Sequence, residues 1–71
     1  MDKTYWMIEK NIDGVAHWWM SRTTYNGSWD SPLRWTTNPH KARHYESKGG
    51  ADYVIGKEMI GCFATEHIDM D

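Results

Sequence analysis

Apolar and polar positions alternate in two stretches near the start of the chain, and this pattern predicts a β-hairpin. Residues 4–9 read Thr-Tyr-Trp-Met-Ile-Glu, an aromatic and branched run that is typical of a strand. Residues 15–20 form a second apolar run. Between them, residues 11–14 end in the Asp-Gly pair that suits a tight hairpin turn. We therefore expect a hairpin over residues 4–21.

Helical spacing replaces alternation in the second half of the chain. Asn38 and Pro39 form an N-cap and first-turn pair, so a short helix is expected over residues 40–45. Ser47 can cap a second helix from Lys48 to about Lys57, because its apolar positions are three and four residues apart. The pattern leaves open whether these are two helices or one kinked helix.

Two further short strands complete the predicted fold. Residues 33–36 follow Pro32 and are aromatic and β-branched, while residues 62–68 form a final run of strand type. The predicted order is β-β-β-α-α-β. We expect one α+β domain over residues 1–71, with a three- to four-stranded antiparallel sheet and one helical layer on one face.

The aromatic residues are more numerous than such a core requires, with five Trp, four Tyr and one Phe among 71 residues. Trp6, Trp35 and Tyr45 are expected to fill the core. Trp18 and Trp19 are adjacent in one strand, so they must point to opposite faces of the sheet. One of this pair therefore faces away from the helical layer.

Two interpretations of that second face remain open. Tyr25 and Trp29 could fold back over it and form a small cluster with Tyr5, Met7 and one of the Trp pair. Alternatively, the face is a recognition surface for a protein partner or for a second copy of the chain. On the second interpretation, the expected binding residues are Trp18, Trp19, Arg22, Tyr25, Trp29 and Arg34.

Charge and cysteine content narrow the class of protein. The formal net charge is −2, from 8 Lys and Arg against 10 Asp and Glu, which argues against a general nucleic-acid binder. Arg residues close to the Trp residues nevertheless keep single-stranded nucleic acid as an alternative ligand. Cys62 is the single cysteine, which favours a reducing compartment. No signal peptide or membrane span is recognised, so a cytoplasmic location is expected.

Histidines invite a comparison with metal sites. His40 and His44 are four residues apart on the expected helix and could share one ion, with a third ligand from His17, Cys62 or His67. The spacing matches no zinc signature. Two histidines facing solvent are the favoured interpretation, so we expect neither a metal nor a cofactor.

The residue pattern does not favour catalysis. Alternation places Cys62 and Glu66 on one face of the last strand and His67 on the other, which excludes a Cys–His pair within that strand. A catalytic site also needs a pocket and groups that stabilise developing charge, and a small sheet with one helical layer offers little of either. We expect a protein that is not an enzyme.

Four motifs recur in the order in which a known family carries them. They are Tyr5-Trp6-Met7-Ile8-Glu9-Lys10, Trp35-Thr36-Thr37-Asn38-Pro39-His40-Lys41-Ala42 with Tyr45 after it, Ala51-x-x-Val54-Ile55, and Ala64-Thr65-Glu66-His67. In this the chain resembles a family of small hypothetical proteins of bacteriophage and prophage genomes. The family has no biochemical activity that could be transferred. The chain departs from it in residues 21–31 and at Gly49-Gly50.

The resemblance implies a phage-encoded accessory protein located in the cytoplasm of the host cell. We expect it to act by stoichiometric binding to a host or phage protein, in host takeover or in neutralising a defence system. A homodimer of unknown function and a single-stranded nucleic-acid binder are the alternatives.

Overall fold

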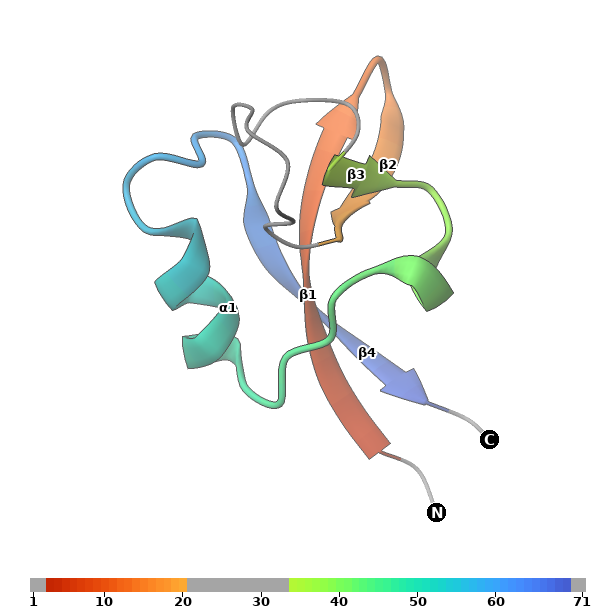
Figure 1. Ribbon diagram of the computed structural model, residues 1–71, viewed down its shortest axis with the longest axis vertical. Helices are drawn as coiled ribbons and strands as arrows, with labels where there is room; N and C mark the ends of the chain where they lie inside the picture. Colours follow the sequence, from red (N-terminus) through yellow and green to blue (C-terminus); the bar gives the residue numbers. More distant parts are fainter. Residues whose placement is uncertain (1–2, 21–33, 70–71) are drawn as a thin grey trace.

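The computed structural model describes residues 3–20 and 34–69 (Figure 1). The elements in these residues are β1 (Lys3–Ile12), β2 (Val15–Trp19), β3 (Trp35–Thr36), the 3-10 helix η2 (Pro39–Lys41), α1 (Lys48–Ile55) and β4 (Phe63–Asp69). The four strands form one antiparallel sheet in the order β3-β2-β1-β4. The predicted α+β class is confirmed, but the described residues contain one α-helix where two were expected.

The hairpin forms as predicted. Strands β1 and β2 pair from Glu9 opposite Trp18 to Ile12 opposite Val15. At the turn, Asp13 has a φ of 52° and Gly14 a φ of 82°. Two successive residues with positive φ match the twist of the flanking strands, and Asp and Gly adopt this conformation more readily than most residues.

The expected helix over residues 40–45 is wrong, because only the first turn is helical. The Asn38 side chain accepts a hydrogen bond from the His40 amide at 3.0 Å, as an N-cap should. The chain then becomes extended, and Tyr45 and Trp6 exchange two backbone hydrogen bonds of 2.7 Å. Strand β2 stops short of this part of β1, so the extended segment supplies the backbone partners that the edge of β1 would otherwise lack.

Helix α1 begins and ends at residues suited to those positions. The Ser47 hydroxyl accepts a hydrogen bond from the Gly50 amide at 3.1 Å. Gly56 follows the last helical residue with a φ of 51°, so the helix is two residues shorter than the sequence suggested. It packs against β1 and β4. Among the residues that the structure describes, no α-helix packs on the opposite face of the sheet.

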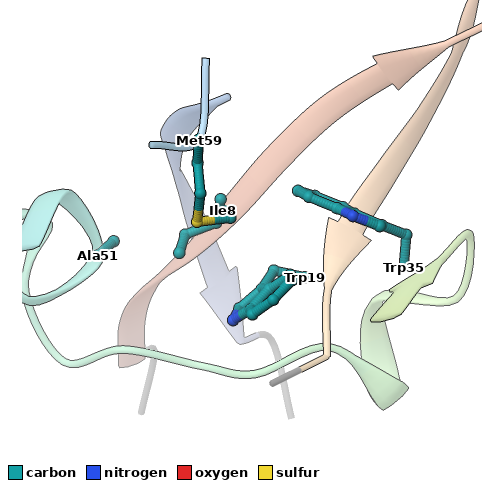
Figure 2. Packing of buried hydrophobic residues seen from close by; sticks show 5 residues of the cluster. All are labelled: Ile8, Trp19, Trp35, Ala51 and Met59. Atoms are coloured by element: carbon teal, nitrogen blue, oxygen red, sulfur yellow. The ribbon is translucent and has the colours of Figure 1, made fainter. Parts of the chain in front are cut away.

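The core lies between this helix and one face of the sheet (Figure 2). Its buried members are Ile8, Trp19, Trp35, Ala51 and Met59. The rings of Trp19 and Trp35 meet edge to face with centroids 5.4 Å apart. Trp35 was expected in the core, and Trp6 and Tyr45 pack against it while partly buried.

Candidate functional site

Alternation along the strands sends a second set of side chains to the face opposite α1. Tyr5 lies opposite His67, Met7 opposite Thr65, and Glu9 opposite both Phe63 and Trp18. His44 reaches the same face, because the next residue along the chain pairs with β1. We call this surface the aromatic face, and its described members are Tyr5, Met7, Glu9, Trp18, His44, Phe63, Thr65 and His67.

Three rings form a row across the aromatic face. The His44 and Tyr5 rings stack with centroids 4.1 Å apart and an interplanar angle of 23°. Tyr5 and His67 stack at 5.7 Å and 17°. His67 stands on β4 while His44 stands beyond the other edge of β1, so Tyr5 lies between the two imidazoles. Both faces of the Tyr5 ring are therefore in contact with another ring.

Trp18 closes the aromatic face over one buried methionine. Its indole Nε1 donates to Glu9 Oε1 at 3.0 Å, and its ring meets the ring of His67 edge-on at 6.1 Å. Trp18 pairs with Glu9 and His67 pairs with Tyr5, so the ring contact passes over Met7, which lies between those two residues on β1. Met7 is 0% exposed.

Each imidazole of the row is held by a hydrogen bond. His44 Nε2–H donates to the carbonyl of Pro39 at 3.1 Å, which ties the ring to η2. His67 Nε2 lies 2.8 Å from Thr65 Oγ1, and that hydroxyl donates to the carbonyl of Met7 at 3.4 Å. These contacts fix ring positions and engage one nitrogen of each histidine.

Described residues beside the sheet line two grooves. One of about 400 Å³ adjoins the row and is lined by Lys3, Thr4, Tyr5, His44, Tyr45 and Glu46. A second of about 630 Å³ lies near the hairpin turn and includes Lys10, Ile12, His17 and Trp35. In this second groove the Lys10 ammonium lies 5.8 Å from the centroid of the Trp35 ring.

Burial perturbs two groups close to the core. Burial raises the pKa of the Cys62 thiol, against the opposing charge of Lys10. Burial also raises the pKa of the Tyr45 hydroxyl, while the Arg43 charge and a hydrogen bond with Trp19 act in the opposite direction. A raised pKa keeps the thiol protonated at neutral pH, which is the opposite of what a nucleophilic cysteine requires.

The structure divides the predicted binding residues. Trp18 lies on the aromatic face, half-buried. Trp19 is only 1% exposed and belongs to the core, and the buried guanidinium of Arg34 lies 6.0 Å from its ring centroid. The part of the predicted surface that rests on Trp19 and Arg34 is therefore not accessible. Arg22, Tyr25 and Trp29 lie outside the described residues, as does their proposed folding over this face.

The suggested pair of metal-binding histidines does not share a helix face. His40 lies on η2, whereas His44 follows in extended chain and stacks on Tyr5. Within residues 3–20 and 34–69, no three His, Cys, Asp or Glu side chains gather into a metal-binding group.

Sequence reasoning missed the row itself. Tyr5 was assigned to the correct face, but the sequence contains no signal for the β1–β4 register that brings His67 beside it. His44 was missed because its position depends on the extended segment that replaces the expected helix.

Comparisons with known proteins add no relative. The chain matches no protein-family model, no curated protein and no solved structure. No helix in the described part of the chain has the length and apolar character needed to cross a membrane.

Proposed function

We propose that the protein acts by stoichiometric binding to another protein through the aromatic face. The observation that supports this most directly is the exposure of rings on the sheet face opposite α1. Phe63 is 46% exposed on that face, His44 is exposed at one end of the row, and the other two rings of the row, Tyr5 and His67, are half-buried. Aromatic side chains of this kind are enriched in protein interfaces, where their large rigid surface is buried.

The row favours a protein partner over a single-stranded nucleic acid. Proteins that bind single strands offer aromatic ring faces on which bases stack. Here both faces of Tyr5 are already covered by imidazoles, so a base would have to displace one of them. The net charge of −2 also lacks the basic excess that tracks a phosphate backbone.

The same features support binding over catalysis. One nitrogen of each imidazole in the row is engaged by Pro39 or Thr65, and the Cys62 thiol has a raised pKa. On the resemblance to small phage and prophage proteins, the partner is a host or phage protein in the cytoplasm of the host cell. We propose that this binding requires no cofactor.

Two matched pairs of substitutions test the proposal. His44→Ser removes an exposed ring from the row, and His40→Ser removes another exposed imidazole from η2. Phe63→Ser removes a ring from the aromatic face, and Tyr53→Ser removes one from α1, where Tyr53 is 79% exposed. The partner is first captured from host lysate with the unaltered chain and identified. Its affinity for each purified variant is then measured.

The two aromatic-face variants should weaken binding by at least about tenfold, as expected for residues within an interface hot spot. The two control variants should bind within about twofold of the unaltered chain. Equal binding by all four variants would remove the aromatic face from the interface. Quenching of tryptophan fluorescence by a short oligonucleotide at low salt would instead support the nucleic-acid alternative.

A further inference from the structure

Strand β4 forms one edge of the sheet, and its backbone directions follow from the pairing of β1. Trp6 directs its N–H and C=O towards Tyr45, on the side of β1 away from β4. Successive residues of a strand point their backbone groups in opposite directions, so Tyr5 and Met7 direct theirs towards β4. Their hydrogen-bonded partners are His67 and Thr65.

The alternate residues of β4 therefore point the other way. Ala64, Glu66 and Ile68 direct their backbone N–H and C=O groups to the outer edge of the sheet. In the described part of the chain, no strand lies beyond β4, and none of the backbone hydrogen bonds between elements involves these three residues. Such an edge is a template for another strand.

Two exposed apolar side chains lie at the two ends of this edge strand, on opposite faces. Phe63 is 46% exposed on the aromatic face. Ile68 is 57% exposed on the other face, because it pairs with Thr4 beyond the part of the sheet that α1 covers. A strand that pairs with β4 would lie against both side chains, one on each face.

We infer that β4 pairs antiparallel with β4 of a second copy of this chain, with the two-fold axis at Thr65. This inference rests on the proposed function, because it also takes the aromatic face as a binding surface. It adds that a second copy of the chain binds where this face ends, at the edge of β4. In this register Phe63 lies opposite the partner's His67, Ala64 opposite the partner's Glu66, and Ile68 opposite the partner's Cys62. Both exposed apolar side chains of β4 gain an apolar or aromatic neighbour.

Charge selects this register over its neighbour. An axis at Glu66 would place the two Glu66 side chains directly opposite each other and Phe63 opposite the partner's Asp69. Like charges in directly opposed positions destabilise a strand pair. With the axis at Thr65, the two Glu66 side chains are diagonal neighbours, about 7–8 Å apart, and remain exposed.

The pairing also extends the row of rings. His44, Tyr5 and His67 already follow one another across the sheet, and Phe63 of the partner subunit becomes the next ring. The symmetric copy of the row ends on this chain's own Phe63. The two sheets join into one, and neither β4 retains a free edge.

A cysteine cross-link tests both the dimer and its register. In the inferred register, position 68 lies opposite the partner's Cys62, which directly precedes β4 and donates its amide to the Met59 carbonyl at 3.2 Å. Directly opposed residues of antiparallel strands have Cα atoms about 4.5–5.5 Å apart, a separation that suits a disulfide. Within one chain the two positions are six residues apart along an extended segment, roughly 20 Å, so an internal bond cannot form. Mild oxidation of Ile68→Cys should therefore convert most of the chain to a covalent dimer. Tyr53→Cys places an exposed thiol on α1, away from the inferred interface, and should form little covalent dimer under the same oxidation.

Sedimentation gives the second readout, without oxidant. The unaltered chain should show a mass that rises from monomer to dimer with concentration. Ile68→Lys should shift the midpoint to at least about tenfold higher concentration, while Tyr53→Lys leaves it unchanged. A concentration-independent monomer mass overturns the inference. So does a dimer whose Ile68→Cys form cross-links no better than the Tyr53→Cys form.

The two proposals fail separately. A monomeric chain that still binds its partner through His44 refutes the dimer and leaves the proposed function standing. His44 lies on the far side of Tyr5 from β4, so a dimer whose partner binding ignores His44→Ser refutes the proposed function alone.

Discussion

The division of Trp18 and Trp19 between two faces can be tested by making one substitution at both positions. Trp→Phe removes roughly three ring atoms from either side chain. Trp19 is 1% exposed and meets Trp35 edge to face at 5.4 Å. At about 0.8 kcal/mol for each buried carbon, Trp19→Phe loses about 2 kcal/mol, and the cavity left behind adds to this. Trp18 is half-buried, so Trp18→Phe loses part of that burial and the hydrogen bond to Glu9, about 1 kcal/mol in all.

A domain of this size has about 3–5 kcal/mol of stability to lose. Trp18→Phe should therefore lower the melting temperature by about 4–8 °C, and Trp19→Phe by at least about 10 °C. Urea denaturation followed by far-ultraviolet circular dichroism gives the free energy of unfolding without depending on tryptophan emission. Equal losses at the two positions, or a larger loss at Trp18, would refute the assignment of Trp19 to the core and of Trp18 to the aromatic face.

Three further outcomes are expected from local features. Burial raises the pKa of Tyr45 in the folded state. Its contribution to the free energy of unfolding should therefore be fully present below the ordinary tyrosine pKa of about 10 and should fall as the pH rises past that value. Urea titrations between pH 8 and pH 11.5 should show a shallower fall for Tyr45→Phe. Ser47→Ala removes the acceptor for the Gly50 amide and should cost about 1 kcal/mol in urea denaturation, with Ser47→Asp restoring most of it. Gly14 has a φ of 82°, and a Cβ added there would meet no atom within 4 Å. Gly14→Ala should therefore lower the free energy of unfolding by about 1 kcal/mol through backbone strain alone. An unchanged melting temperature would contradict that conformation.

Local signals predicted the elements that local chemistry determines. The Asp13-Gly14 turn and the Ser47 cap are each set by one or two residues and their immediate backbone, and the structure confirms both. The placement of Trp18 and Trp19 on opposite faces of the sheet also followed from the sequence, because adjacent residues of one strand point to opposite faces.

The sequence did not predict backbone pairing between segments that lie far apart along the chain. The motif from Asn38 to Tyr45 has the cap and proline of a helix, and local propensity predicts one. The helix stops because β1 has an unpaired edge at Trp6, and Tyr45 supplies the missing backbone partners. That competition depends on where β2 ends, so the position of His44 in the row could not be predicted.

The assignment of surface residues failed for a related reason. Arg34 was expected on the binding surface because it lies close in sequence to the tryptophans, yet its guanidinium is buried near the ring of Trp19. Nothing in the sequence shows that a charged side chain will lie over a core ring. The β1–β4 register, which places His67 beside Tyr5, likewise has no local signal.

The most direct test of the account is the affinity of the identified partner for His44→Ser compared with His40→Ser. Both substitutions remove an exposed imidazole from the same short segment, and only His44 stacks on Tyr5. If the aromatic face is the binding surface, His44→Ser should lose at least about tenfold in affinity and His40→Ser almost none, with both variants folded by circular dichroism. Equal affinity of the two variants for the partner would contradict the claim that the aromatic face is the binding surface.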